Sequence, residues 1–330
     1  MKLSYLNLTT TDPAWNLAAE QYVFDCLTKD RMYFMLWQND RAVIIGKHQN
    51  TLAQINESYV KEKGIRVVRR LSGGGAVYHD MGNLNFTFIA DAAQKDTLDM
   101  QMFCLPVLQT LRALGVDAQI NGRNDMTIGG KKFSGNSQYV KNGRVMHHGT
   151  ILFRSDLDAV EQALNVDPEK IRAKGVDSVR SRVTNVAEHL DGGVSLDRFR
   201  QLLLANVLQE TPGEAYEFTP RDLDEIEKLR QTRYDTWQWN YGASPACTLR
   251  KKARIEGCGT VEAYLDVAHG RIAGVTFHGD FFSISEPAEL AQMLVGCRPE
   301  RADYKALLDK TDVSRYFVGM TPAQFLELME

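Results

Sequence analysis

The sequence predicts an α+β protein in which mixed β-sheets are flanked by helices, with a smaller α+β unit at the C-terminus. Apolar residues recur at helical spacing after Thr11-Asp12-Pro13, whereas residues 83–88 alternate between polar and apolar as in a β-strand. Residues 236–245 combine aromatic residues with small turn-forming ones, and beyond them a new pattern of strands and helices begins. We therefore expect one domain at residues 1–245 and a second at residues 246–330.

Length and charge restrict the class of protein. A chain of 330 residues favours two domains. The 39 Lys and Arg residues against 42 Asp and Glu residues give a formal net charge of -3, so there is no general attraction to nucleic acid or to an anionic membrane. No apolar run is long enough to span a bilayer, and residues 1–10 lack the apolar core of a signal peptide. We expect a cytoplasmic monomer.

Cysteine usage indicates neither disulfides nor zinc. The five cysteines are odd in number, dispersed, and contain no CxxC pair. Each is expected to be a small buried apolar residue. These residues are Cys26, Cys104, Cys247, Cys258 and Cys297.

The individual elements follow from local signals. Asp12 and Pro13 predict the start of a helix of about fifteen residues. Gly115 predicts the end of a helix over 98–114, and Ser195 the start of one over 194–208. Further helices are expected at 58–63, 157–164, 287–295, 301–308 and 321–328. Strands are expected at 32–38, 42–46, 65–68, 83–88, 118–120, 126–128, 132–133, 138–140, 144–146, 150–153, 258–267 and 272–277.

The most informative segment runs from Arg69 to Asp80 and contains two arginines, a serine and three successive glycines. It lies between strand-like runs at 65–68 and 83–88, which predicts a strand, a glycine loop and a second strand. Glycines let backbone N–H groups converge on an oxyanion, and the adjacent Arg70 favours a phosphate. The spacing is neither that of a Walker loop nor GxGxxG. A tight connection without a ligand is the other interpretation.

A second polar cluster runs from Asn124 to Gln138 and contains the adjacent lysines Lys131 and Lys132. In a β-strand the two would point to opposite faces, so one can face a cleft while the other is solvated. The pattern leaves open which one does so. Asp125 has two interpretations, a Mg²⁺ ligand alongside a nucleotide or the cap of a turn.

Three further polar stretches have competing interpretations. The pair His147-His148 has no third ligand at a recognisable spacing, so hydrogen-bonded structure is favoured over a metal site. The basic run 250–254 favours a solvated edge over a binding site. The polar loop 47–50 could be a solvated turn or face a ligand with its lysine.

Together the glycine loop, the lysine cluster and the histidine pair supply anion-binding backbone, an arginine, a lysine and a carboxylate, which indicates chemistry at a phosphoryl centre. At these residues the sequence resembles the lipoate–protein ligase A family, within the group that also contains biotin protein ligases and octanoyltransferases. The resemblance is carried by Asp12-Pro13, Asn16-Leu17-Ala18, Leu36 to Asn39, Gly46 to Asn50, Arg69 to Asp80, Gly82-Asn83, Asn124-Asp125, Gly130 to Gly135 and His147 to Thr150. It runs over about the first 245 residues, and the remainder resembles the accessory domain of the same ligases.

The resemblance implies a catalytic domain with the class II biotin/lipoate ligase fold. It also implies an activity: ATP and free lipoate would form lipoyl-AMP with loss of pyrophosphate, and the lipoyl group would pass to a lysine of an acceptor protein. ATP and Mg²⁺ are the implied cofactors. The acceptor would be glycine-cleavage H protein, the lipoyl domains of 2-oxoacid dehydrogenases, or both.

Carried over residue by residue, the resemblance assigns the site. Lys132, directly before Phe133-Ser134-Gly135, matches the essential lysine of the family, which selects it over Lys131. Trp37 would line the pocket for the apolar tail of lipoate, and Asp125 would be the Mg²⁺ ligand. The residues that match the lipoyl-AMP pocket are Arg70, Ser72, Gly74, Gly75, Ala76, Val77, Tyr78, His79, Asn83, Asp125, Gly135 and His148.

Three alternatives compete with this function. An octanoyl or lipoyl carrier-protein transferase of the same fold would work without ATP, but such enzymes rely on a cysteine or on carrier chemistry, and no cysteine lies in the three clusters. A non-catalytic lipoate or nucleotide sensor is disfavoured by the intact lysine and glycine loop. A biotin ligase is disfavoured because no DNA-binding helix-turn-helix precedes the domain and the two motifs, Lys-Phe-Ser-Gly and His-His-Gly-Thr, are of the lipoate type.

Overall fold

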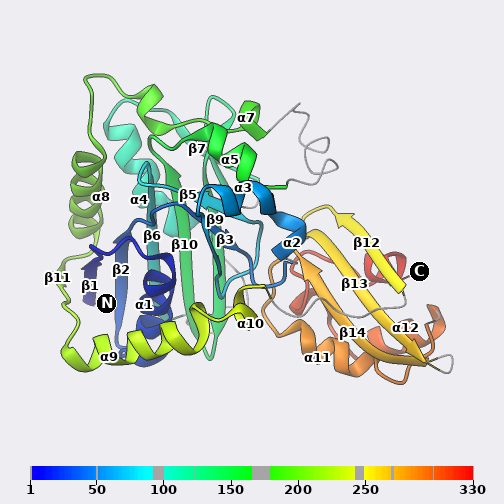
Figure 1. The fold of residues 1–330 in the computed structure, drawn as a ribbon. Helices are drawn as coiled ribbons and strands as arrows, with labels where there is room; N and C mark the ends of the chain where they lie inside the picture. Colours follow the sequence, from blue (N-terminus) through cyan, green and yellow to red (C-terminus); the bar gives the residue numbers. More distant parts are fainter. Residues whose placement is uncertain are drawn as a thin grey trace.

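The computed structural model describes residues 2–49, 51–91, 100–122, 124–165, 179–241, 249–268, 271–299 and 301–329. A larger N-terminal unit and a smaller C-terminal unit lie side by side (Figure 1). The strands are β1 (Lys2–Asn7), β2 (Arg31–Trp37), β3 (Ala42–Ile45), β4 (Arg66–Arg69), β5 (Val77–His79), β6 (Asn83–Asp91), β7 (Ala118–Asn121), β8 (Asp125–Ile128), β9 (Lys131–Lys141), β10 (Arg144–Leu152), β11 (Gly213–Ala215), β12 (Leu249–Ile255), β13 (Gly259–Ala268) and β14 (Arg271–Gly279). The helices are α1 (Pro13–Cys26), α2 (Thr51–Gln54), α3 (Glu57–Glu62), α4 (Gln101–Ala113), α5 (Leu157–Ala163), α7 (Val179–Arg182), α8 (Leu196–Glu210), α9 (Pro220–Leu229), α10 (Trp237–Asn240), α11 (Pro287–Leu294), α12 (Arg301–Leu308) and α13 (Pro322–Met329), with short helical turns η1 (Val186–His189), η2 (Arg230–Tyr234) and η3 (Val313–Arg315).

The N-terminal unit is built on an eight-stranded mixed sheet of order β11-β1-β2-β6-β10-β9-β8-β7. β1 runs parallel to β2 and β11, whereas the other neighbours are antiparallel. Side chains alternate between the two faces, so Phe34 and Phe86 pack against α4 and α8 while Met35 packs against α1. The predicted mixed sheet flanked by helices is confirmed.

The strand register aligns polar residues on the α1 side of this sheet. Trp37, Asn85 and Thr150 are direct partners across β2, β6 and β10. Two residues further along, His148 pairs with Thr87 on one side and with Ser137 on the other. These positions share one face because residues two apart in a strand point the same way. They form the floor of the site.

A second, three-stranded sheet of order β4-β3-β5 carries the glycine loop. β3 is parallel to β4 and antiparallel to β5, and residues 70–76 connect β4 with β5. The sequence predicted the loop and its first strand but missed β5, which is three residues long and too short to show alternation. The predicted strands at 32–38 and 42–46 also lie in different sheets, so the turn between them joins two layers.

The C-terminal unit is a three-stranded antiparallel sheet, β12-β13-β14, whose apolar face is covered by α11, α12 and α13. Its two later strands and its three helices were predicted. β12 was missed because four of its seven residues are basic, which hides the alternation expected of a strand. The unit contacts the glycine loop directly: Gly74 N donates to Phe281 O at 3.2 Å, and the His48 ring stacks on Phe281 at 4.6 Å. Lys47 pairs with Glu286, so the polar loop 47–50 is part of this interface.

Most helix signals are confirmed. Asp12 accepts from the backbone N–H groups of Ala14 and Trp15 at the start of α1, and Ser195 caps α8. Residues 92–99 and 242–248 are outside the described residues. The predicted start of the helix at 98 and the predicted domain boundary at 245/246 fall in these two segments and are therefore not tested. Within the described residues, the helices are all too short or too polar to cross a bilayer.

The cysteine prediction is partly wrong. Cys104 and Cys258 are buried, as expected, but Cys297 is only half-buried and Cys26 is exposed, because it lies at the last, outward-facing position of α1. These four are free thiols. Cys247 lies outside the described residues.

Candidate active site

A cavity of about 930 Å³ lies where the glycine loop, the polar face of the large sheet and the C-terminal unit meet. Its lining contains these sequence-predicted residues: Trp37, Arg70, Gly74, Gly75, Ala76, Val77, Tyr78, His79, Asp125, Lys132, Gly135 and His148. Ser72 and Asn83 are buried beside the cavity and do not line it. Asn85, two residues beyond Asn83 on β6, lines it instead. Its signal was present in the alternation of residues 83–88, which places Asn83 and Asn85 on one face.

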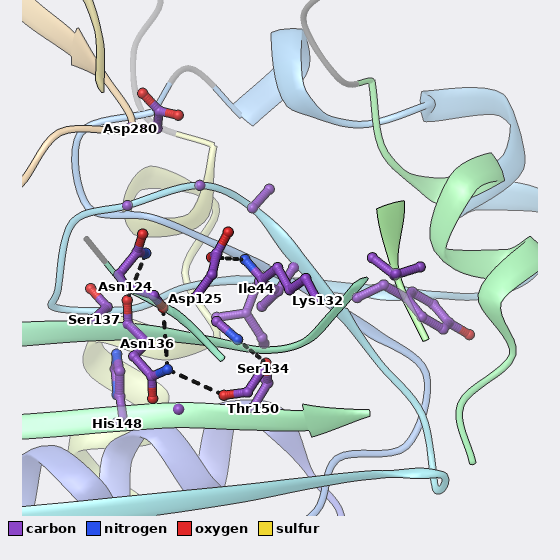
Figure 2. A pocket seen from close by; sticks show the side chains of 18 of the residues that line it. Ile44, Asn124, Asp125, Lys132, Ser134, Asn136, Ser137, His148, Thr150 and Asp280 are labelled. Carbon is purple, nitrogen blue, oxygen red and sulfur yellow. Dashed lines mark hydrogen bonds and ion pairs between the residues drawn. The ribbon is translucent and has the colours of Figure 1, made fainter. Parts of the chain in front are cut away.

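The two lysines are distinguished by a bulge in β9. Met126 pairs with Ser134, but Thr127 pairs with Lys132, so the register shifts by one residue at Phe133. As a result Lys131 is exposed, whereas Lys132 reaches the cavity and forms an ion pair with Asp125, Nζ to Oδ1 2.6 Å (Figure 2). Arg182 binds the other oxygen of Asp125 at 2.9 Å. Arg182 also lines the cavity and was missed by the sequence analysis.

The guanidinium of Arg70 is bound to its own loop. Its Nη2 donates to the carbonyl oxygens of Gly73 and Gly75 at 2.6 and 2.9 Å, and its Nη1 donates to Ile44 O at 3.2 Å. Gly74 between them has φ +90°, a conformation that favours glycine. Burial lowers the pKa of Arg70 to about 10, so the side chain is still charged at neutral pH. The sequence suggested that Arg70 meets a phosphate, but in the structure most of its donors fix the shape of the loop.

Behind the cavity floor, a buried carboxylate orients His148. Glu20 of α1 is 2 % exposed and accepts from His148 Nδ1 at 2.9 Å and from the Thr87 hydroxyl at 2.6 Å. The other ring nitrogen of His148 lies 2.6 Å from Ser72 Oγ, which in turn accepts from Arg70 Nε at 3.0 Å. The predicted hydrogen-bonded histidine is thereby confirmed. Glu20 was missed, because a carboxylate within a buried helix gives no signal of its own.

His79 is held as a neutral ring by a relay of amides. Asn16 Nδ2 donates to Gln38 O and to Asn39 Oδ1, at 2.8 and 2.9 Å, which turns Asn39 Nδ2 toward His79 Nδ1 at 3.0 Å. Burial, together with the charges of Arg70 and His148, lowers the pKa of His79 to about 3. The neutral ring accepts at Nδ1 and therefore carries its proton on Nε2.

The segment before β8 is tied to β9 by a smaller amide network. Asn124 Nδ2 donates to Asn136 O at 2.9 Å, and Asn136 Nδ2 donates to Ser134 Oγ at 3.2 Å (Figure 2). These three residues line the cavity between Lys132 and His148. The network fixes the backbone that presents Asp125.

The described residues do not build a metal site by themselves. Nowhere in the described ranges do three or more His, Cys, Asp or Glu residues come together to hold a metal ion. Asp125, the predicted Mg²⁺ ligand, has each of its oxygens bound to a cation, Lys132 or Arg182. A Mg²⁺ ion here would need most of its oxygen ligands from a nucleotide.

Both parts of the chain match models of known domain families. Residues 12–208 match the lipoyl protein ligase A/B catalytic domain, and residues 244–329 match the bacterial lipoate protein ligase C-terminus. Lipoate–protein ligase 1 of Staphylococcus aureus is 40% identical over 323 residues, covering 98% of each chain. Lipoate-protein ligase LplJ of Bacillus subtilis is 40% identical over 326 residues, again covering 98% of each chain.

Solved structures agree with these matches. Plasmodium falciparum LipL1 in complex with lipoate has a TM-score of 0.81 at 23% identity, covering 98% of this chain and 97% of that one, which shows the shared fold. A lipoate-protein ligase A bound with ATP has a TM-score of 0.65 at 29% identity, over 73% and 99% of the two chains. A bipartite ligase of Thermoplasma acidophilum, described with its E2 lipoyl domain, has a TM-score of 0.66 at 30% identity, over 76% and 100%. The chain therefore belongs to the lipoate–protein ligase family.

Proposed function

We propose that this cavity carries out both half-reactions of a lipoate–protein ligase. The enzyme joins free lipoate to AMP at the expense of ATP, releases pyrophosphate, and then transfers the lipoyl group to a lysine of an acceptor protein. The observation that carries the assignment of the site is Lys132, an ammonium group in the wall of a cavity that is also lined by the glycine loop, the polar face of the large sheet and the C-terminal unit.

In the first half-reaction, a carboxylate oxygen of lipoate attacks the α-phosphorus of ATP, and the bond from that phosphorus to the bridging oxygen of pyrophosphate breaks. Negative charge increases on the non-bridging oxygens of the α-phosphate. Lys132 stabilises this charge from a fixed position, which is more effective than water because the group needs no reorganisation. The exchange is favourable because Asp125, on losing Lys132, still keeps Arg182.

In the second half-reaction, the uncharged amine of the acceptor lysine attacks the acyl carbon of lipoyl-AMP, AMP leaves with the electron pair of the acyl–oxygen bond, and the nitrogen loses one proton to solvent as the amide forms. The same Lys132 holds the acyl carbonyl and the phosphate in line with the amine. The glycine loop, shaped by Arg70, lies along the ligand. His148 borders the site through its bonds to Ser72 and Glu20.

The acyl chain would run from Lys132 on β9 toward Trp37 on β2. Those strands are separated by β10 and β6, so the distance is three interstrand spacings, roughly 14 Å. Leu17, Trp37 and Ile44 line that end of the cavity and provide an apolar wall. This length suits an octanoyl-length chain that ends in a dithiolane ring.

ATP is accompanied by Mg²⁺ in this proposal, as the counter-ion of the nucleotide. No step is assigned to the ion. Asp125 remains the proposed ligand from the chain, because its Oδ1 becomes available when Lys132 moves to the phosphate, while its other oxygen keeps Arg182. We also propose that the enzyme is a cytoplasmic monomer and that its domains divide at residue 245. Its acceptors would be glycine-cleavage H protein, 2-oxoacid dehydrogenase lipoyl domains, or both. The lipoyl domains are supported by the Thermoplasma acidophilum ligase that has been described with its E2 lipoyl domain.

One assay tests the function. The purified chain is mixed with ATP, Mg²⁺ and lipoate, each acceptor is added separately, and the mass of the acceptor and the release of pyrophosphate are measured. We expect the acceptor to gain one lipoyl group only when ATP and lipoate are both present. Transfer from a lipoylated carrier protein without ATP would favour the carrier-protein transferase instead. The described cysteines, which all lie outside the cavity lining, argue against that alternative.

A further inference from the structure

Three cations of the basic run on β12 lie on one face of the strand; two of them are bound to a carboxylate, and the third is not. Arg250, Lys252 and Arg254 occupy alternate positions of the strand and therefore share one face. The first two bind the same carboxylate on β13, Glu262, at 2.6 and 3.6 Å. Arg254 is instead paired in register with Thr260, whose hydroxyl it approaches at 3.3 Å. Among the described residues its partner is thus a neutral group.

Arg254 also differs from its neighbours in where it lies. It lines the same cavity as Lys132, although it belongs to the C-terminal unit. The other arginines and lysines in the described lining have other commitments: Arg70 holds the carbonyls of the glycine loop, and Lys132 and Arg182 share Asp125. The expected solvated edge is therefore a correct description of Arg250 and Lys252 but not of Arg254.

The wall around Arg254 makes its charge important for an anionic ligand. Glu256 and Asp280 of the C-terminal unit line the cavity next to it, and Figure 2 shows Asp280 on the side of the cavity away from β10. Without Arg254, the charged side chains that the described residues of this wall present to a polyphosphate would all be carboxylates. A guanidinium is suited to this position because its N–H groups match two phosphate oxygens at once and remain charged.

We propose that Arg254 binds the β- and γ-phosphates of ATP and is a catalytic residue of the first half-reaction. This inference rests on the proposed function. When the bond between the α-phosphorus and the bridging oxygen breaks, the electron pair stays on pyrophosphate, and Arg254 stabilises the charge that increases there. Lys132 acts on the α-phosphate from the opposite wall. Lipoyl-AMP has no β- or γ-phosphate, so Arg254 has no partner in the transfer step.

The test compares Arg254→Gln with Lys252→Gln, a control on the same face of β12 whose lysine binds Glu262 away from the cavity. Calorimetry measures the affinity of each protein for ATP and for AMP. Losing one charged contact to phosphate should weaken ATP binding of Arg254→Gln about tenfold. AMP binding should change less than twofold. Pyrophosphate release with lipoate should fall, while transfer from supplied lipoyl-AMP should keep the unaltered rate.

Several results would overturn the proposal. These are equal losses of ATP and AMP affinity, equal losses in both half-reactions, and an equal effect of Lys252→Gln. Arg254→Lys keeps the charge and the packing of the aliphatic stem, so it should recover part of the ATP affinity. If Arg254→Gln folds poorly, the comparison is made with this lysine variant instead. Nucleotide binding is measured without lipoate and therefore does not depend on the ligase activity. If the ligase assignment is wrong, the unaltered enzyme will release no pyrophosphate, and this result is distinct from a change in ATP affinity.

Discussion

Lys132 Nζ lies 2.6 Å from Asp125 Oδ1, and this pair joins the bulged start of β9 to β8 at the wall of the cavity. Because Arg182 binds the second oxygen, the three side chains together carry a single positive charge. Repulsion between the two cations weakens the hold of Asp125 on each of them. A phosphate can therefore take over Lys132 without leaving a buried carboxylate unpaired. The arrangement keeps the lysine in place in the absence of ligand and releases it when one binds.

Replacing Lys132 by alanine should reduce ATP- and lipoate-dependent pyrophosphate release by about 10²- to 10³-fold, since the charge that forms on the α-phosphate loses its fixed partner. Lys131→Ala is the matched control, because Lys131 is the exposed neighbour on the same strand. Its rate should stay within twofold of the unaltered enzyme. Similar rates for the two alanine variants would refute the assignment of Lys132.

Arg70→Lys tests whether Arg70 acts through its charge or through its geometry. A lysine keeps the positive charge, but its donors all sit on one nitrogen. It therefore cannot reach Ile44 O, Ser72 Oγ and the Gly73 and Gly75 carbonyls at once, as the three nitrogens of the guanidinium do. We expect pyrophosphate release to fall about tenfold or more, as for the loss of a positioning group. Arg66→Lys, at an exposed arginine paired with Asp12 and Asp235, is the control. Unaltered kinetics in Arg70→Lys would show that charge alone is sufficient.

The parts of the site that depend on local sequence were predictable. Three successive glycines after Arg70 predicted a loop that approaches a ligand, and the loop does line the cavity. The choice between Lys131 and Lys132 was not available from alternation, because the bulge at Phe133 breaks the period on which alternation relies. It came from the resemblance to a family.

The parts that depend on distant contacts were not predictable from local sequence. Glu20 reaches His148 across 128 positions of the chain, and nothing near Glu20 indicates such a partner. Arg254 looks like one member of a basic run until the packing of the C-terminal unit places it in the cavity wall. In both cases the surroundings of the charged group depend on packing between parts of the chain that are distant in sequence. The residues next to it in the sequence therefore do not predict those surroundings.

Because His147 is buried, we predict that the free energy of unfolding depends on pH. The ring is held with Nδ1 accepting from Gln138 and Nε2 3.3 Å from Asn136 Oδ1, and burial lowers its pKa to about 3 from the ordinary 6.5. Between these two values the unfolded chain binds a proton that the folded chain does not. The free energy of unfolding therefore decreases as pH falls below 6.5, by about 1.4 kcal/mol per pH unit for each such histidine. Above pH 6.5 the effect is absent.

Urea unfolding of His147→Gln at several pH values between 5 and 7 checks this. The variant should be less stable at every pH, but its loss of stability between pH 6 and 5 should be shallower by about 1 kcal/mol. His189→Gln, at an exposed histidine, controls for the substitution itself. Parallel stability curves for the His147 variant and the unaltered chain would rule out a buried neutral ring.

Gly73 makes the closest approach between the glycine loop and the C-terminal unit. A Cβ added there would lie 2.2 Å from Phe281 O, which is backbone and cannot move aside as a flexible side chain could. Gly73→Ala should therefore displace the segment that begins at Phe281, break the bond from Gly74 N to Phe281 O, and cost about 1–3 kcal/mol of stability. The wall that carries Arg254 and Asp280 would move with it. Pyrophosphate release should then fall about tenfold, the value expected when a positioning contact is lost.

Gly274→Ala is the control for this change. Gly274 lies in β14 of the same unit, and an added Cβ would meet the Cβ of Asp266 at 4.0 Å, an ordinary contact distance. Its stability and its rate should both remain close to those of the unaltered chain. If the unit serves only the first half-reaction, Gly73→Ala should still transfer the lipoyl group from supplied lipoyl-AMP, because Lys132 and the floor of the cavity belong to the N-terminal unit. Equal losses in both half-reactions would instead mean that displacement of the C-terminal unit deforms the glycine loop itself.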